Sequence, residues 1–338
     1  METDKKHLGI RRRTLVFAAG GMGAAAGTQA QLAQLAQGPQ GPHVVKIIVG
    51  FPAAQATDVV ARLLADKLPA VTGGNYIVDN RPGRGGSLAM GALARSPADG
   101  SVMMLAHMSA VATNPHMYKS VPYDPLKDFE AVGLLADLPF VLVCHPSMPF
   151  NTIEQLVRYA KENPGKLTNA SSGNGTVSHL AMEDFKARAG IDILHVPYKG
   201  SGPGLADVVA GQVSLALETA AAVQPFIQSG RLKALGTGTT KRLSTMPNVV
   251  PIAEQGFEGF SAVTWLMLLY PAGTDKHLVS NTFAAMNKAL QTPEVDARMR
   301  QIGVIPRFSA STAEAAAFIG SEYAHWGEVV RRSGVRLD

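Results

Sequence analysis

The stretch KIIVGFPAAQATDVVARLLADKL, residues 46–68, decides the fold because a buried strand, a tight turn and a helix follow one another in it. Val44–Val49 is a continuous, β-branched run that ends at a glycine and a proline, which predicts a buried strand. Over 57–68 apolar residues recur at helical spacing, and Thr57 or Asp58 stands at the expected N-cap. The turn between them contains no Lys, Arg or His, so any ligand bound there is held without cationic side chains.

Short strands and helices alternate along most of the chain. Apolar runs predict strands at 76–78, 102–106, 167–170, 193–196, 213–217 and 232–236. Segments with helical spacing predict helices at 87–94, 152–162, 176–189, 202–210, 221–229, 276–290, 293–301 and 311–331. Such alternation favours an α/β fold with mainly parallel sheets.

Two longer apolar segments, 132–146 and 260–273, interrupt this alternation. Each is long enough to form a strand that passes from one lobe to another, so the sequence predicts two α/β lobes joined by two crossing strands. We place the first lobe at 44–138 and 263–338, and the second at 139–262. Ligands bind open α/β sheets beyond the carboxyl ends of the strands, which points to the cleft between the lobes.

Residues 1–30 have the pattern of an export signal. The basic segment KKHLGIRRR precedes a short apolar core and a small-residue site, and cleavage is expected near Ala30. The core is shorter than the ~20 residues that a membrane span needs. The three arginines fit a twin-arginine signal, and an ordinary secretory signal fits as well. The mature protein is therefore expected in the periplasm, after a polar linker at 31–43.

The remaining composition argues against several classes of protein. The formal charge of +5 falls to about +2 without residues 1–30, and no dense basic stripe suggests nucleic-acid binding. The single Cys144 has no internal disulfide partner and fits a buried position on a strand. No G-x-S-x-G, P-loop or H-E-x-x-H motif occurs, and the nine histidines lack metal-binding spacing. We therefore expect no metal and no cofactor.

Three predicted strand-to-helix turns share one chemical character. They are GFPAAQATD (50–58), SSGNGTVSHL (171–180) and PYKGSGPGL (197–205), which are rich in glycine, hydroxyl groups and small residues. Backbone N–H groups point outward from such turns, and the following helix N-terminus adds roughly half a positive charge. A turn of this kind binds an anion, most simply a carboxylate. Each turn taken alone is equally compatible with a plain connection.

Three further residues have two interpretations each. His179, in the first turn of a helix, either lines the cleft or packs against the glycine turn. Glu218, after the strand 213–217, either receives a hydroxyl, an ammonium or a second carboxyl group of a ligand or begins a helix in solvent. Trp265 either contacts ligand carbons or packs in the core. The sequence leaves these alternatives open.

Ten short motifs in a fixed order resemble one known family. They are FPAAQATD (51–58), DNRPGRGG (79–86), PADG (97–100), YDPLKDF (123–129), NPGKL (163–167), SSGNGTVSHLA (171–181), HVPYKGSGP (195–203), GQV (211–213), PAGT (271–274) and WGEVVRRSGV (326–335). Together they resemble the periplasmic substrate-binding proteins of tripartite tricarboxylate transporters, also called the Bug family. The resemblance spans 45–335, nearly the whole mature chain.

The resemblance implies a bilobed periplasmic-binding-protein fold of the Venus-flytrap type (type II) that captures a carboxylated metabolite for a membrane permease. It also implies that backbone amides and ordered water of the first turn and of the second-lobe Ser-Gly turn hold the carboxylate. Carried over by position, the ligand-binding residues are Phe51, Ala54, Gln55, Ala56, Thr57, Asp58, Ser171, Ser172, Gly173, Asn174, Gly175, Thr176, His179, Gly200, Ser201 and Glu218.

The chain departs from the family pattern mainly in the first turn. Where the family usually reads PFPAGGATD, Gly50 replaces the first proline, and Ala54 and Gln55 replace the two glycines. Gln55 brings a side-chain amide to a position where the family has only backbone, which leaves the identity of the ligand open. Met267 stands where the return strand commonly has glycine, and Glu218 where the family often has aspartate.

Three functions are compatible with these features. The first is a monomeric exported receptor that captures a small carboxylate (a di- or tricarboxylate, an acidic amino acid or an aromatic acid) for the permease of a tripartite tricarboxylate transporter. The second is a carboxylate sensor without a permease of its own. The third is a serine hydrolase that uses Ser171 or Ser172 with His179 and a polarised turn as oxyanion hole. No acid is placed to orient His179, so we expect no catalytic residues.

Overall fold

The computed structural model describes residues 44–53 and 55–337. The predicted export signal at 1–30, the predicted linker at 31–43 and Ala54 of the first turn lie outside the described residues. Within the described part of the chain, no helix combines the length and the apolar character that crossing a membrane requires.

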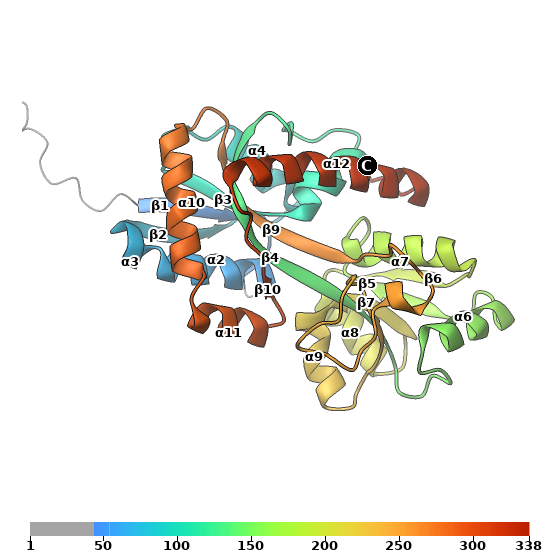
Figure 1. The fold of residues 1–338 in the computed structure, drawn as a ribbon. Coiled ribbons are helices and arrows are strands. Elements are labelled where there is room, and N and C mark those ends of the chain that lie inside the picture. Colours follow the sequence, from blue (N-terminus) through green and yellow to red (C-terminus); the bar gives the residue numbers. More distant parts are fainter. Residues whose placement is uncertain (1–43, 54, 338) are drawn as a thin grey trace, which may run out of the picture. The chain divides into compact units, whose positions relative to one another are not determined.

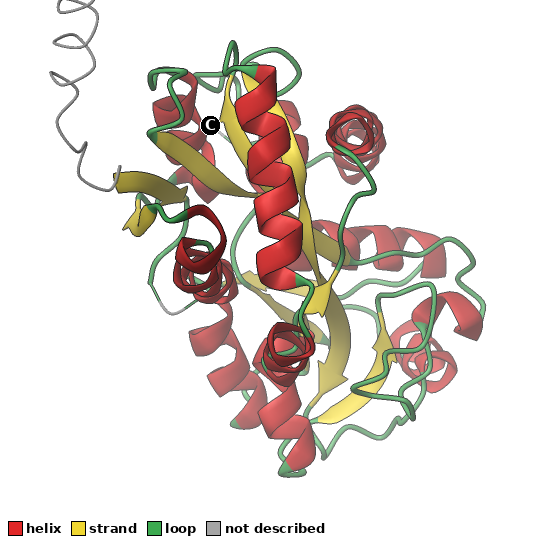
Figure 2. Ribbon diagram, turned by 60° about the vertical axis from the view of Figure 1, so that its left-hand side comes forward, coloured by secondary structure: helices red, strands yellow, loops and turns green. Residues whose placement is uncertain are grey.

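The strands form one hydrogen-bonded path in the order β2-β1-β3-β9-β4-β7-β5-β6, and β8 and β10 also pair with β4. Their bounds are β1 Val44–Val49, β2 Asn75–Asn80, β3 Val102–His107, β4 Phe129–Cys144, β5 Thr168–Ser171, β6 Leu194–Pro197, β7 Leu215–Thr219, β8 Lys233–Thr237, β9 Val263–Pro271 and β10 Ile305–Pro306. Helices lie on both sides of these strands (Figure 2).

The helices follow the strands at short intervals, as the sequence predicts. Their bounds are α2 Ala56–Lys67, α3 Pro69–Thr72, α4 Ser87–Ala94, α5 Asn114–Met117, α6 Ile153–Glu162, α7 Val177–Ala189, α8 Ser201–Val209, α9 Ala220–Gln228, α10 Lys276–Leu290, α11 Pro293–Gln301 and α12 Thr312–Ser333. Shorter helical turns are η1 Arg84–Gly86, η2 Ser109–Thr113 and η3 Ile252–Gln255.

Two long strands, β4 and β9, join two parallel groups of strands. β1 pairs in parallel with β2 and β3, and β5 pairs in parallel with β6 and β7. β9 is antiparallel to β3 and to β4, whose pairing with β9 extends to Pro139. From Phe140 onward β4 pairs with β7 instead. The predicted α/β fold with two crossing strands is confirmed, and it is the bilobed type II fold (Figure 1).

Two regions differ from the prediction in ways that affect the site. The strand predicted at 213–217 is β7, Leu215–Thr219, so Glu218 lies inside the strand rather than after it. Local propensity disfavours Glu in a strand, and here the buried partners of its side chain override that preference. The segment after β3, which the sequence left without an assignment, forms the π-helical turn η2, and all of its residues are buried.

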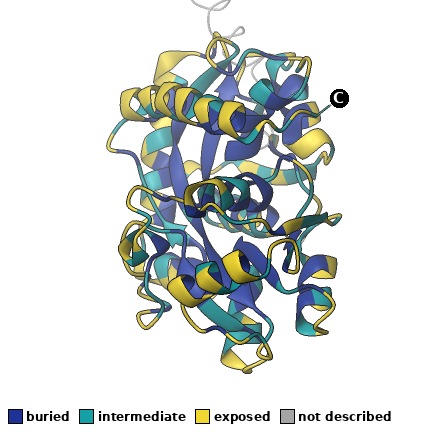
Figure 3. Ribbon diagram, turned by 90° about the vertical axis from the view of Figure 1, so that its right-hand side faces the viewer, coloured by how far each residue is buried: buried dark blue, intermediate teal, exposed yellow. Residues whose placement is uncertain are grey.

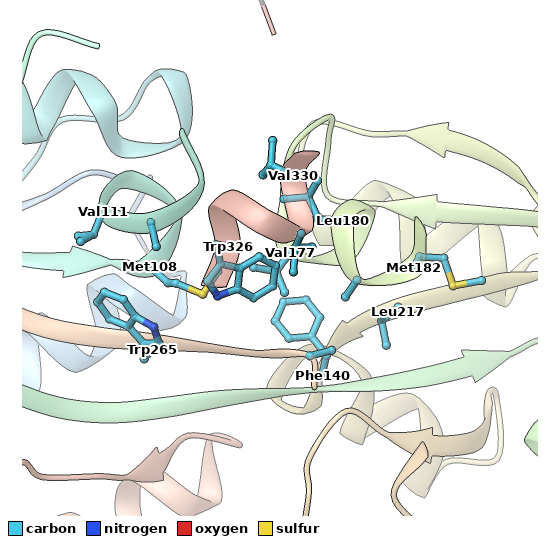
Figure 4. Packing of buried hydrophobic residues seen from close by; sticks show 14 of the residues in the cluster. Met108, Val111, Phe140, Val177, Leu180, Met182, Leu217, Trp265, Trp326 and Val330 are labelled. Atoms are coloured by element: carbon cyan, nitrogen blue, oxygen red, sulfur yellow. The ribbon is translucent and has the colours of Figure 1, made fainter. Parts of the chain in front are cut away.

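Most strand residues are buried, while many residues on the outer sides of the helices are exposed (Figure 3). One hydrophobic cluster includes Trp265 of β9, Phe140 of β4, Val177 of α7 and Trp326 of α12 (Figure 4). Trp265 is only 2% exposed, so it packs in the core. Cys144 is buried as predicted.

The C-terminal segment contacts α7 and the turn before it. Arg332 of α12 donates to Asp184 Oδ1 of α7 at 3.2 Å. Just before α7, an added Cβ on Gly175 would lie 2.7 Å from Leu337 Cδ1 and 2.8 Å from Met117 Sδ. The φ of Gly175 is +74°, so both the backbone and the available space require glycine. The turn before α7 is thereby held against Met117 of α5 and Leu337 of the C-terminal segment.

The predicted cap of α6 is present and allows a stability test. Thr152 Oγ1 accepts from Gln155 N–H at 3.2 Å. We expect Thr152→Ala to lower the free energy of unfolding by about 1 kcal/mol, because one N–H of the first turn loses its acceptor. Urea denaturation measures the change. Glu162→Ala, at the exposed end of the same helix, is the control and should stay within about 0.5 kcal/mol of wild type; equal losses in both variants would contradict the cap.

Candidate functional site

The first turn is braced from behind by a buried acid. Asp58 is 1% exposed and accepts from Asn80 Nδ2 and from Arg62 Nε, both at 2.9 Å. Asn80 Nδ2 also donates to the carbonyl of Phe51 at 3.0 Å. The predicted N-cap at Thr57 or Asp58 is wrong: α2 begins at Ala56, and its N-cap is Gln55, which makes no side-chain capping bond among the described residues. Asp58 therefore fixes the shape of the turn.

His107, which the sequence analysis did not single out, supports the same turn. Its ring lies 4.8 Å from the ring of Phe51, centroid to centroid. Its Nδ1 shares a 2.9 Å hydrogen bond with Ser109 Oγ, and its Nε2 a 3.0 Å bond with Thr264 Oγ1. Burial lowers the pKa of His107 to about 4, so the ring is neutral. His107 could have been predicted as a site residue because it directly follows the predicted strand 102–106.

Two serines of the second-lobe turn are bonded to different side chains. Ser171, which is 1% exposed, shares a 2.6 Å hydrogen bond with His195 Nε2. Ser172 Oγ donates to Glu218 Oε1 at 2.5 Å. Within the described part of the chain neither serine is bonded to His179, so the Ser–His179 pair of the hydrolase hypothesis does not form. The physical reason is that His179 is bonded elsewhere.

Several amides of the second-lobe turn already have acceptors inside the protein. The N–H groups of Ser172 and Gly173 donate to serine hydroxyls of the same region at 2.9 and 3.2 Å. Gly175 N–H donates to His179 Nδ1 at 3.1 Å, and Thr176 N–H to the carbonyl of Gly173 at 3.3 Å. These amides are therefore occupied, and the hydroxyl of Thr176 likewise donates inside the turn, to the carbonyl of Gly173 at 2.7 Å.

His179 packs against the glycine turn and against a second histidine. The rings of His179 and His195 are stacked, with centroids 3.8 Å apart and planes 8° apart. Burial, with a smaller contribution from His195, lowers the pKa of His179 to about 4, and burial also lowers the pKa of His195. Because both rings are neutral, His179 Nδ1 can accept the Gly175 N–H. The stacking of His195 on His179 was not predicted, since sequence spacing does not reveal a ring contact between a strand and a helix.

Glu218 is the acid of the second-lobe turn. It is 3% exposed and lies in β7, so the alternative that it begins a helix in solvent is wrong. Burial raises the pKa of Glu218 to about 7, and hydrogen bonds from Ser172 and Ser178 lower it in part. No described Lys, Arg or His forms an ion pair with Glu218. Burial without a paired cation therefore makes the protonated carboxyl group accessible near neutral pH.

The third turn adjoins the second. Gly200 N–H donates to the carbonyl of Ser172 at 3.1 Å, and Gly200, with φ +106°, precedes Ser201 at the start of α8. Asn174 of the second turn is exposed. The structure thus joins one group through hydrogen bonds: Ser171, Ser172, Gly173, Gly175, Thr176, His179, Gly200 and Glu218. A separate group at the start of α2 holds Phe51, Gln55, Ala56, Thr57 and Asp58.

Two cavities lie outside these turns. One of about 560 Å³ is lined by residues of α6, α7 and α12 that include Lys161, Lys186 and Arg332. The other, of about 340 Å³, is lined by α7 and α12. Neither is lined by a residue predicted to bind the ligand, so the candidate site is defined by the turns and not by these cavities.

The family model described as "Tripartite tricarboxylate transporter family receptor" matches residues 60–335. The chain belongs to this family. The Bug protein BugT of Bordetella pertussis is 35% identical to this receptor over 294 residues, which cover 87% of this chain and 90% of BugT. The predicted family membership is confirmed, and the receptors of this family are periplasmic binding proteins.

Solved structures of periplasmic binding proteins agree with the family membership of this chain. The R. palustris protein Rpa4515 with adipate has a TM-score of 0.80 and 31% identity to this receptor, over 87% of this chain and 99% of that chain. The periplasmic binding protein BugD has a TM-score of 0.75 and 31% identity, with coverages of 87% and 98%. MatC from Rhodopseudomonas palustris with bound malate has a TM-score of 0.75 and 27% identity, with coverages of 85% and 98%.

Proposed function

We propose that this receptor captures a small carboxylate in the periplasm and delivers it, as a monomer, to the membrane permease of a tripartite tricarboxylate transporter. The observation that carries the proposal is the likeness to Rpa4515 with adipate and to MatC with malate. Both ligands are organic acids, and the turns of this chain offer hydroxyls and a helix N-terminus to an anion. The export signal cleaved near Ala30 belongs to this proposal.

The proposed ligand lies between the start of α2 and the second-lobe turn. The lobes are 44–138 with 263–338, and 139–262, which is supported by the change of β4 pairing from β9 to β7 after Pro139. Gln55 offers a side-chain amide, and the second-lobe turn holds the hydroxyls of Ser172 and Thr176, which in this structure donate to Glu218 and to the Gly173 carbonyl. Movement of the lobes about β4 and β9 would enclose the ligand, and affinity would follow its preference for the enclosed state.

Calorimetry with a panel of carboxylates tests the proposal. The panel holds adipate, malate, citrate, glutamate and benzoate, which differ in length, charge and ring content. We expect saturable binding of at least one member with one ligand per chain. Absence of heat and of thermal stabilisation across the whole panel would contradict the proposal. Native mass spectrometry of freshly purified protein, to detect a co-purified metabolite, identifies the physiological ligand.

Ser172→Ala tests the second-lobe turn in particular. We expect affinity for the tightest-binding panel member to fall about tenfold, because one hydroxyl donor to the carboxylate is lost. The fold should persist because Ser172 N–H keeps its bond to Ser178. Ser280→Ala, exposed on α10, is the matched control with unchanged affinity. An unchanged Kd in Ser172→Ala would remove this turn from the site.

A further inference from the structure

The hydroxyl of Ser172 donates to the buried carboxyl of Glu218, and no described cation is paired with that carboxyl. Ser172 Oγ and Glu218 Oε1 are 2.5 Å apart, Ser172 is half-buried, and Glu218 is 3% exposed. The other polar groups that face Glu218 are the hydroxyl of Ser178 and the backbone at Thr219 and Ser172. The acid therefore lies behind Ser172, and its route to a ligand passes through that hydroxyl.

Ionisable groups on the neighbouring elements are engaged elsewhere. On α7, His179 accepts from Gly175 N–H, and Lys186 donates to Glu183. On β6, His195 is bonded to Ser171. On α8, Asp207 accepts from Tyr198, and Lys199, just before α8, is exposed. The strand β5, the helix α9 and the part of β4 that pairs with β7, Phe140–Cys144, contain no Asp, Glu, Lys, Arg or His. No cation of these elements therefore holds the carboxyl of Glu218 in its ionised form.

The protonation state of Glu218 decides what Ser172 can offer. A serine hydroxyl has one proton to donate and two lone pairs. When Glu218 is ionised it only accepts, so Ser172 must donate to it and turns lone pairs toward any further partner. When Glu218 is protonated it can donate to Ser172 Oγ, and the hydroxyl proton of Ser172 is free for a carboxylate oxygen.

Resting on the proposed function, we propose that the receptor binds its carboxylate together with one proton, which Glu218 carries and Ser172 transmits as a hydrogen-bond donor. Glu218 is then a positioning residue that selects carboxylate over ammonium at this point of the site. An ionised pair would present acceptors only, which suits an ammonium group and repels a carboxylate. Burial without a cation, which raises the pKa of Glu218 to about 7, supports a proton that is available near neutral pH.

Calorimetry of adipate and malate binding in buffers of different ionisation enthalpy counts the protons taken up. At about pH 8 the free ligands are ionised and Glu218 is largely ionised, so we expect uptake of close to one proton per ligand bound. The Kd should rise by up to about tenfold for each pH unit above about 7. Glu218→Gln, whose amide donates as the protonated acid would, should bind without proton uptake and without this pH dependence.

Glu183→Gln is the matched control on the same lobe, because Glu183 is paired with Lys186. It should keep the proton uptake of wild type. Binding of adipate or malate to wild type with no proton uptake and no pH dependence would overturn the inference and leave the proposed function intact. Loss of proton uptake in Glu183→Gln rather than in Glu218→Gln would also overturn it, since another acid would then carry the proton.

A measurement on the unliganded protein separates the inference from the proposed function. If no carboxylate binds wild type, the proposed function fails, and infrared difference spectra of wild type minus Glu218→Gln still report the protonated carboxyl. We expect its C=O band at about pH 6 and its loss with a midpoint near pH 7, given the raised pKa of the group. A spectrum without this band at about pH 6 would overturn the inference.

Discussion

Trp265→Ala is expected to lower the free energy of unfolding by about 3–5 kcal/mol, as large-to-small changes of aromatic core residues do. Trp265 is 2% exposed, and its ring lies 5.2 Å from the ring of Phe318 in an edge-on contact. Its Nε1 donates to Glu322 Oε2 at 2.7 Å, and Trp326 Nε1 donates to the same oxygen at 3.2 Å. Alanine leaves a cavity and removes one of the two donors to that carboxylate.

Denaturant unfolding of Trp265→Ala beside Trp265→Phe tests this expectation. Phenylalanine keeps much of the volume and loses only the N–H, so a loss of about 1–2 kcal/mol is expected. A loss below about 1 kcal/mol in the alanine variant would contradict core packing at this position. Adipate affinity, measured on folded Trp265→Phe, should stay unchanged, because the side chain is buried in the core rather than facing a ligand.

The architecture was predictable because each of its signals is local. The β-branched run Val44–Val49, the helical spacing after it and the length of the two apolar segments depend on neighbours in sequence, and they predicted β1, α2, β4 and β9. The end of β7 was not predictable, because the partners that keep Glu218 in a strand are distant in sequence. The π-helical turn η2 was missed for the same reason, since its residues are buried against other parts of the chain.

The site was predictable as a set of residues and less so as a network. The glycine-rich composition indicated where the turns are. It did not indicate that N–H groups of the second-lobe turn donate to His179 and to two serine hydroxyls. Composition alone does not show which amides are occupied, because that depends on rotamers and on distances across the turn. Likewise, the pairing of Ser171 with His195 joins positions 24 residues apart, a separation at which no periodic pattern is informative.

The stability of the protein should depend on pH through Glu218. Its pKa is raised from the ordinary value of 4.5 to about 7, mainly by burial. Between these two values the folded protein holds a proton that the unfolded chain has released. The contribution of Glu218 to the free energy of unfolding is therefore fully present below about pH 4.5. It is lost as the pH rises through about 7, and the total loss is about 3 kcal/mol. Glu218→Gln cannot ionise and should not show this loss.

Urea unfolding of wild type and Glu218→Gln at a series of pH values isolates the contribution. The lowered pKa values of His107 and His179, both about 4, act with the opposite sign: they add stability as the pH rises toward their unfolded value of 6.5. Both histidines are present in both proteins, so their contributions cancel in the difference. The unfolding free energy of Glu218→Gln minus that of wild type should therefore increase by about 3 kcal/mol from about pH 4.5 to about pH 8. A difference that stays constant over this interval would mean that Glu218 keeps an ordinary pKa in the folded protein, which would require a cation or water beside it.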